Sequence, residues 1–349
     1  MDYLRTERNN DEDATLAARA AWLYFAGGKT QGEVADLLNV PNTRAHRLIA
    51  RASREGLIKV FVDGPIAGCV GLEEELKSRF ALSHCEVVPN IDDGPIAVRT
   101  LGTAGARSIR NLIERGEHET IGIGHGRTLA AAIELLPNIS ARHIKFVSLL
   151  GGLTRRFAAN PFDVIHRLAE RTGAEAYLMP VPFFANSVKD KEVLLSQYGI
   201  EEVISLARRA SLYIAGIGTV EPDSFLASSG MIGRADIAEV RRAGARGEIL
   251  GQFFTSEGNH LSCSLSDRAL APALDDLKNR TIIALAGGAS KAEALHAVLG
   301  SGLLSGLITD EASARRLIDE RPSRGPAIRT GKPRKPRQTC NPDGGNGNA

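Results

Sequence analysis

Short apolar segments, several of which end in glycine, recur along this chain and constrain its fold more than any other feature. These segments span residues 85–89, 120–124, 144–152, 176–182, 212–218 and 281–288, with helical segments between them. Strands that are apolar on both faces must be covered on both sides, and strands that alternate with helices form parallel sheets. The sequence therefore predicts an α/β domain with a mostly parallel sheet over residues 72–320.

The length and the scattered cysteines and histidines limit the class of protein further. At 349 residues the chain is too long for one ordinary core. Its acidic start lacks the apolar region of a signal peptide, and no apolar run approaches the roughly 18 residues of a membrane-spanning helix. We therefore expect a soluble, cytoplasmic protein. The four cysteines form no CxxC pair and the eight histidines no metal-ligand spacing, so we expect no disulfide framework, metal or cofactor.

Positive charge is concentrated at the two ends of the chain. Residues 15–61 hold seven Lys or Arg against three Asp or Glu, and residues 321–349 hold seven against one, although the formal net charge of the whole chain is only +2. The last segment also has five prolines and five glycines and almost no apolar residues. A segment of this composition buries too little apolar surface to offset its chain entropy. We predict a disordered basic tail, whose charge could attract DNA or simply aid solubility.

Three short helices with a tight break are predicted near the start. Apolar residues at helical spacing predict a first helix over 15–26, which the glycine pair 27–28 ends. Thr30 and Glu33 have the spacing of a capping box for a second helix over 31–38. Pro41 suits the first position of a third, basic helix that ends at Gly56. The β-rich segment 57–62 and the turn at 63–65 predict the wing of a winged helix-turn-helix over 14–63.

This arrangement would let the third helix enter the major groove of DNA while the second helix braces it. Short or forked donors near the start of the third helix suit base edges and phosphates. The candidate DNA-contacting residues are Thr30, Gln31, Asn42, Thr43, Arg44, His46, Arg47 and Arg51. The alternative is a small helical bundle with a solvated basic face.

Two strand–glycine–helix motifs predict an anion site in the second domain. In GIGHGRTLAAAIELL, backbone N–H groups at the helix start would cradle an anion, and Arg127 and Thr128 would add charge and a hydroxyl. A dinucleotide fingerprint would need glycine at position 127, and a purely structural glycine turn is the other alternative. In ALAGGASKAEALHAVL, Lys291 falls in the first helical turn, where a bound phosphate would favour it over a plain surface lysine.

Across residues 20–62 and in the order of its later motifs, the chain resembles the SorC family of bacterial sugar-responsive transcription regulators. The later motifs are GIGHGRTLAAA, LLGG, AGIGT, GEILGQFF and ITDEASARRL. The motifs AHRLIARA and GHGRTLAA resemble those of family members that regulate erythritol catabolism. The resemblance implies a winged helix-turn-helix joined to an effector domain similar in fold to sugar-phosphate isomerases. It also implies a homo-oligomer, dimer or tetramer, whose binding to double-stranded operator DNA is controlled by a phosphorylated sugar or polyol.

The resemblance also assigns candidate effector-binding residues. They are Gly124, His125, Gly126, Arg127, Thr128, Gly152, Gly218, Glu257 and Lys291. The family usually has an acid where this chain has Thr255, so Glu257 or Asn259 is expected to contact the ligand hydroxyls instead. The closest approach to a nucleophile motif, GASKA at 288–292, lacks its final glycine. We therefore expect no catalytic residue and a repressor, with an isomerase-like enzyme or a DNA-binding scaffold as the alternatives.

The predicted organisation has five parts. A disordered N-terminus covers 1–13, the DNA-binding domain 14–63, a linker 64–71, the effector and oligomerisation domain 72–320, and the disordered tail 321–349. The amphipathic segment LEEELKSRF has Leu72, Leu76 and Phe80 on one face. It fits equally a linker helix that transmits the effector signal and a helix packed on the core.

Overall fold

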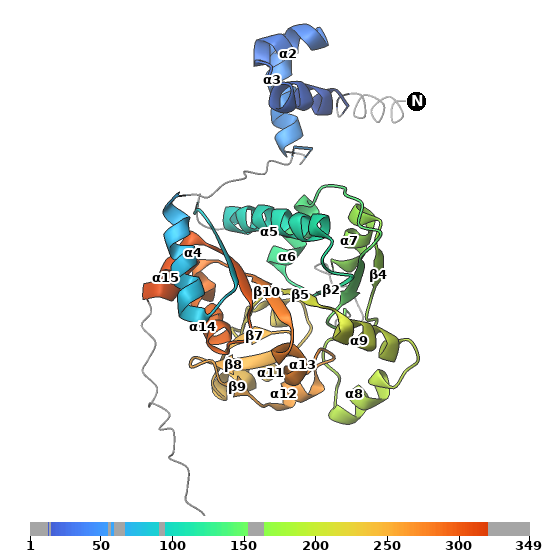
Figure 1. Ribbon diagram of the computed structural model, residues 1–349, viewed down its shortest axis with the longest axis vertical. Helices are drawn as coiled ribbons and strands as arrows, with labels where there is room; N and C mark the ends of the chain where they lie inside the picture. The colour runs from blue at the N-terminus through green and yellow to red at the C-terminus, as the bar shows by residue number, and fades with distance from the viewer. Residues whose placement is uncertain are drawn as a thin grey trace, which may run out of the picture.

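A seven-stranded, fully parallel sheet forms the centre of the larger domain (Figure 1). The computed structural model describes residues 13, 15–54, 57–58, 67–90, 95–152 and 164–319. The strand order is β1-β11-β10-β5-β2-β3-β4. The strands are β1 His84–Val88, β2 Thr120–Ile123, β3 Lys145–Ser148, β4 Glu175–Tyr177, β5 Leu212–Ala215, β10 Thr281–Leu285 and β11 Gly306–Asp310. All six predicted strands are confirmed as members of this sheet, whereas β11 was not predicted.

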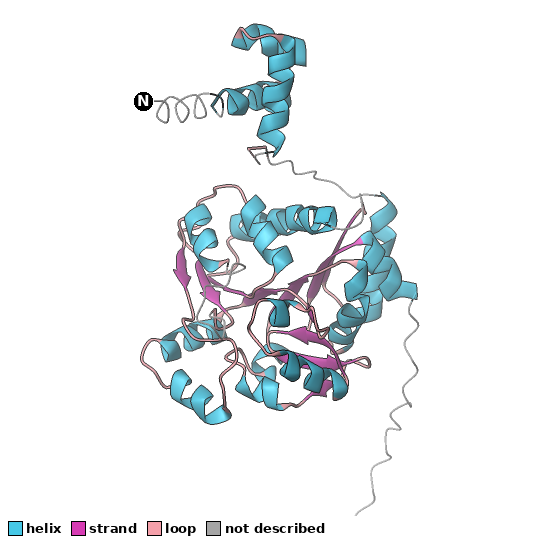
Figure 2. Ribbon diagram, turned by 180° about the vertical axis from the view of Figure 1, so that it is seen from behind, coloured by secondary structure: helices cyan, strands magenta, loops and turns pink. Residues whose placement is uncertain are grey.

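Apolar side chains on both faces of the sheet hold it between two layers of helices (Figure 2). In β5, Leu212 and Ile214 face one apolar cluster, and Tyr213 and Ala215 face the other. The first layer consists of α5 Pro95–Arg115, α6 Arg127–Leu135 and α7 Ile165–Thr172. The second includes α4 Ala67–Phe80, α9 Ile200–Arg209, α14 Ala292–Gly300 and α15 Glu311–Asp319. Burial of both faces is the property that the sequence pattern predicted.

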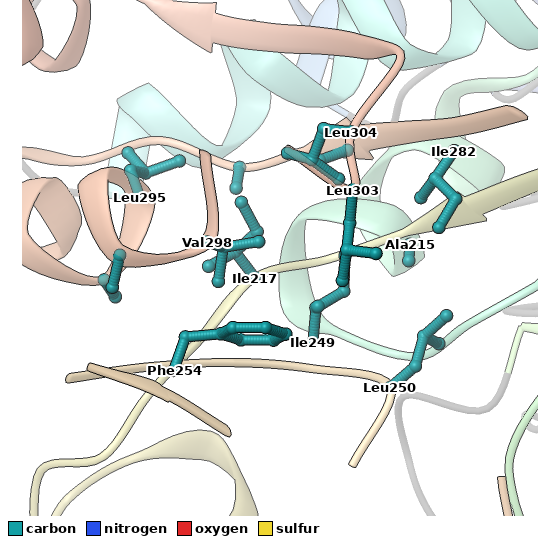
Figure 3. Close-up of a cluster of buried hydrophobic side chains, with 14 of the residues drawn as sticks. Ala215, Ile217, Ile249, Leu250, Phe254, Ile282, Leu295, Val298, Leu303 and Leu304 are labelled. Carbon is teal, nitrogen blue, oxygen red and sulfur yellow. The ribbon is translucent and has the colours of Figure 1, made fainter. Parts of the chain in front are cut away.

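A small antiparallel sheet, which was not predicted, extends the second layer. It has the order β6-β7-β8-β9, with β6 Gly218–Thr219, β7 Ala245–Ile249, β8 Gln252–Thr255 and β9 His260–Leu261. Leu250 and Gly251 both have positive φ angles, of 50° and 79°, and form the tight turn between β7 and β8. Phe254 and Ile249 of this sheet lie near Val298 of α14 (Figure 3), which joins the small sheet to the main core.

The remaining helices are short and connect these layers. They are α8 Val188–Leu195, α10 Phe225–Ser228, α11 Arg234–Arg242, α12 Ser264–Arg268, α13 Leu274–Lys278 and the 3₁₀ turn η2 Ala289–Lys291. None of the helices in the described ranges is long and apolar enough to cross a membrane.

The N-terminal helices have an apolar core of their own. Residues 15–21 are helical and lead into a π-helical turn, η1 Trp22–Ala26, followed by α2 Gln31–Leu38 and α3 Asn42–Arg54. Ala20, Val34 and Leu48 are buried together in the cluster that these segments share. The predicted first helix therefore has the predicted extent, but its last five residues are wound as a π-helix.

The predicted capping box of α2 is confirmed. The Glu33 N–H donates to Thr30 Oγ1 at 3.3 Å, and the Thr30 N–H donates to Glu33 Oε2 at 2.8 Å. At the other end, Asn39 has a φ of 52° and ends the helix in the left-handed conformation. The second and third helices therefore follow each other across a break of three residues.

Of the two interpretations of LEEELKSRF, the core-facing helix is the one that the structure shows. The segment belongs to α4, in which Leu76 is fully buried and Leu72 and Phe80 pack against the same apolar cluster. α4 already begins at Ala67, inside the segment expected to be a linker. Most of the predicted wing, the turn at 63–65, the first part of the linker, nearly all of the N-terminal segment and the basic tail lie outside the described residues.

Candidate functional site

A pocket opens at the carboxyl ends of the central strands. After β2 the chain adds strands toward β4, and after β5 it adds them in the opposite direction, so β2 and β5 flank the point where the strand order reverses. Ligand sites of open α/β sheets lie at this kind of position. The pocket has an empty volume of about 560 Å³, which includes space open to solvent. Its walls come from the turns after β2 and β5, from β7 and from η2.

The turn between β2 and α6 supplies one wall. Gly126 precedes α6 with a φ of 137°, a conformation that favours glycine. His125 is buried and its ring lies edge-on to Phe183, with the ring centroids 6.4 Å apart. Arg127 is exposed and Thr128 is buried, and both line the pocket. The start of α6 therefore offers backbone N–H groups, a guanidinium and a hydroxyl to the same space.

Lys291 enters the pocket from the opposite wall. Lys291 is the last residue of the 3₁₀ turn η2 and the N-cap of α14. The prediction that it lies inside the first turn of the α-helix is therefore wrong, because the 3₁₀ turn precedes that helix. Its Nζ donates a hydrogen bond to the carbonyl of Ile217 at 3.1 Å. The contact ties the lysine to the segment that follows β5.

A buried carboxylate at the end of β11 holds the glycine turn that presents Lys291. Asp310 Oδ2 accepts hydrogen bonds from the Gly288 N–H at 2.6 Å and from the Ser313 hydroxyl at 2.8 Å, and Oδ1 accepts one from the Ser313 N–H at 2.9 Å. A Cβ on Gly287 would collide with this carboxylate, so only glycine fits there. Asp310 lies in the ITDEASARRL motif, but without the β11 strand its role could not be recognised.

Glu248 is the acid of the pocket, and sequence reasoning missed it. It lies on β7, is 6% exposed, and accepts a hydrogen bond on Oε1 from the Gly251 N–H at 2.7 Å. Its carboxylate occupies the space beside Gly218, where a Cβ would collide with it. The only sequence signal was an acidic residue inside the otherwise apolar GEILGQFF motif.

Burial and neighbouring charges shift two pKa values in the pocket. Burial raises the pKa of Glu248 to about 7, although the Gly251 N–H and the Lys291 charge oppose the shift. Burial and, to a smaller extent, the nearby Arg127 charge lower the pKa of Lys291 to about 8, although the Glu248 charge opposes the shift. Two basic side chains and one buried carboxyl group with a raised pKa therefore share the pocket.

Three of the predicted effector residues do not line this pocket. Gly124 is not part of the pocket lining, and a Cβ added at this position would lie only 3.3 Å from Ala215. The Gly152 N–H donates to the Met179 carbonyl at 3.2 Å, away from the pocket lining. Glu257 is exposed and its Oε1 accepts a hydrogen bond from the Ser256 hydroxyl at 2.8 Å. The structure brings together the other six, which are His125, Gly126, Arg127, Thr128, Gly218 and Lys291.

The third helix of the N-terminal domain has a basic, exposed face. Ala45, Leu48, Ile49 and Ala52 are buried, whereas Asn42, Thr43, Arg44, His46 and Arg47 are exposed and Arg51 is half-buried. The helix contains no acidic residue. Asp13 forms ion pairs with Arg44, at an N–O distance of 3.0 Å, and with Arg51, at 3.8 Å. Arg47 has no ion-pair partner among the described residues. Thr30 is engaged in the capping box, and its neighbour Gln31 is exposed.

Comparisons with known proteins identify a family and relatives that match most of the chain. A family model described as "Putative sugar-binding domain" matches residues 64–319. The erythritol catabolism regulatory protein EryD of Brucella abortus (strain 2308) is 50% identical over 310 residues, which are 89% of this chain and 98% of that protein. The transcriptional regulator LsrR of Enterobacter sp. (strain 638) is 31% identical over 309 residues, 87% of this chain and 92% of that protein.

A solved structure has the same fold over most of the chain. The full-length sorbitol operon regulator SorC from Klebsiella pneumoniae superposes with a TM-score of 0.62 and 21% identity, and the match covers 88% of this chain and 99% of that one. The fold and the site thus define a transcriptional regulator with a sugar-binding domain. The chain belongs to the SorC family.

The raised pKa of Glu248 predicts a specific pH dependence of stability. Because the folded pKa is about 7 and the ordinary value 4.5, the folded protein keeps a proton that the unfolded chain loses between these values. This contribution to the free energy of unfolding is present below pH 4.5 and is lost as the pH rises through about 7, and it amounts to about 3 kcal/mol. Glu248→Gln should therefore lose less stability than the wild type between pH 5 and 7.5 in urea unfolding.

The matched control is Glu257→Gln, which changes an exposed carboxyl group whose pKa is lowered by its hydrogen bonds. This variant should follow the wild-type curve over the same pH range. Parallel curves for Glu248→Gln and the wild type would contradict the assignment of a raised pKa to Glu248.

Proposed function

We propose that the protein represses an operon for the breakdown of a carbohydrate or polyol, and that a phosphorylated sugar or polyol controls its binding to DNA. The observation that carries this proposal is the convergence of Arg127, Lys291 and Glu248 on one pocket at the ends of the central strands. The name of the relative EryD, which refers to erythritol catabolism, supports a small polyol or its phosphate as the effector class.

The phosphate group of the effector would lie between the start of α6 and Lys291. Arg127 and Lys291 lie close enough for the Arg127 charge to lower the pKa of Lys291, so a bound dianion would relieve their repulsion. Backbone N–H groups at the start of α6 favour an anion in the same place. Thr128 would add a hydroxyl donor. The effector would therefore enter with its phosphate toward the β2–α6 turn.

The hydroxyl groups of the effector would lie against Glu248. A carboxylate accepts hydrogen bonds from hydroxyls, and the one backbone N–H bond that Glu248 accepts, from Gly251, leaves acceptor capacity for them. Gly218 makes room for this carboxylate, which explains why glycine is found at that position. Glu248 would thus replace the missing acid at Thr255 as the group that recognises hydroxyls.

The N-terminal helices would bind operator DNA with α3 in the major groove and α2 across the backbone. The exposed polar and basic side chains of α3 lie opposite its buried apolar stripe, so DNA binding would not disturb the core. Arg47 stands out among them because it has no intramolecular ion pair among the described residues. Its guanidinium is therefore available to a guanine or a phosphate.

Replacing Arg47 with alanine should weaken operator binding by about tenfold or more, because a contact of this kind contributes roughly 1–3 kcal/mol. The measurement is fluorescence anisotropy of labelled operator DNA at fixed salt. Arg19→Ala is the matched control, since Arg19 is an exposed arginine on the first helix. If both variants lose the same operator affinity, or if Arg47→Ala loses none, Arg47 does not contact the operator.

Replacing Lys291 with methionine should leave DNA binding intact and shift the response to a phosphorylated effector to at least tenfold higher effector concentration, because a charge-assisted hydrogen bond is lost. A gel-shift titration with the effector measures this directly. Lys278→Met, which removes an exposed lysine paired with Asp275, provides the control. An unchanged effector response in Lys291→Met would place the phosphate elsewhere.

We also propose that the protein acts as a homo-oligomer, because helix-turn-helix proteins read paired half-sites as dimers. An apolar surface on the N-terminal domain supports this: Trp22 is 65% exposed and Phe25 is 50% exposed, and both lie on η1 rather than on the basic face of α3. A second copy of the domain would cover these aromatic rings.

Because the chain contains a single tryptophan, its fluorescence reports on this surface alone. Acrylamide should quench Trp22 less when the protein is bound to an operator with two half-sites than when it is bound to a single half-site. Equal quenching on the two DNA fragments would show that the η1 surface is not covered by a second copy.

A further inference from the structure

A second cavity lies beneath α8 and α9, on the side of the main sheet that the second layer of helices covers (Figure 1). Its walls come from the end of β3, from α8 and α9, and from the segment that joins α12 to α13. It shares no lining residue with the effector pocket. The two sites are therefore separate, and the inference that follows does not depend on the proposed function.

The walls of this cavity are mostly apolar. Its apolar lining includes Leu149, Met179, Leu195, Ile204, Leu270 and Pro272. Met179 and Leu270 are almost fully buried, whereas Leu195 and Ile204 are half-buried and complete the same apolar cluster. The cavity has an empty volume of about 500 Å³, which includes space open to solvent. A small molecule with a hydrocarbon body would find apolar contacts on several sides.

One positive charge in the cavity has no carboxylate partner among the residues that line it. Lys191 of α8 is half-buried, and its Nζ donates to the carbonyl of Asp267 at 3.0 Å. It forms no ion pair within 4 Å with any side chain in the described part of the chain, and burial lowers its pKa, whereas the charge of Asp267, which does not line the cavity, opposes this shift. The other charged residues of the lining, Arg208 and Asp276, pair with each other at 3.3 Å. Lys191 is therefore the one charged residue of the lining that is partly dehydrated and pairs with no other lining residue.

We infer that this cavity binds a small monocarboxylate with an apolar body. The carboxylate would pair with Lys191, and the hydrocarbon would lie against Leu195, Ile204 and Leu270. A single anionic charge matches the single lining cation that has no partner in the cavity, whereas a phosphate dianion would bring a second negative charge into a cavity that Asp276 also lines. A neutral molecule of the same shape would cover the ammonium without replacing its lost hydration.

A comparison of hexanoate with hexan-1-ol shows how much of the binding affinity comes from the charge of the ligand and how much from its shape. Binding of each compound to the full-length protein is measured at pH 7 and fixed ionic strength by ligand-detected NMR titration. Hexanoate should bind about tenfold or more tightly than hexan-1-ol, which corresponds to one charge-assisted hydrogen bond. Equal binding of the two compounds, or no saturable binding of hexanoate, would overturn the inference without any variant.

Two lysine variants on the same helix locate the site. Lys191→Met should weaken hexanoate binding by about tenfold, whereas Lys189→Met, which changes an exposed lysine two residues away, should bind like the wild type. Lys291→Met should also keep hexanoate binding, because that lysine belongs to the effector pocket. If Lys191→Met binds hexanoate as the wild type does, or if Lys291→Met loses it, the carboxylate lies outside this cavity and the inference fails.

Discussion

The structure depends on one constraint, which is that both faces of the central parallel sheet are buried. Each residue of β5 is buried, with side chains directed alternately into two separate apolar clusters. A sheet of this kind offers no solvated face on which polar groups could gather, so they collect where the strands end. The turns after β2, β5 and β10 are rich in glycine because they pass close to one another and to buried carboxylates.

Two buried carboxylates at these strand ends, those of Asp310 and Glu248, have different roles. Asp310 accepts hydrogen bonds from Gly288 and twice from Ser313, and thereby fixes the turn that carries Lys291. Glu248 accepts a hydrogen bond only from the Gly251 N–H among the donors in the described residues, and burial raises its pKa to about 7. A saturated carboxylate suits a structural role, and an incompletely bonded one suits recognition of a ligand hydroxyl.

The sequence predicted the periodic features and missed those made by long-range contacts. The six parallel strands, α2 and its capping box follow from apolar period and cap chemistry, which are local. β11, the small antiparallel sheet and the role of Glu248 depend on segments far apart in the chain. Six of the predicted effector residues line the pocket, but Gly124 and Gly152, which follow strands, do not, and Glu257, which was placed by analogy with a motif, is exposed. Proximity along a motif does not determine which way a strand residue faces.

We propose that a phosphorylated compound in the strand-end pocket controls a sequence-specific complex of the protein with DNA. The most direct test is binding of the full-length protein to its own upstream DNA at fixed salt, with a panel of phosphorylated tetritols, pentoses and hexoses and their unphosphorylated forms. We predict that one phosphorylated compound alters the specific complex and that its unphosphorylated form does not at the same concentration. A specific complex that no phosphorylated compound alters, or one that both forms alter equally, would contradict the claim.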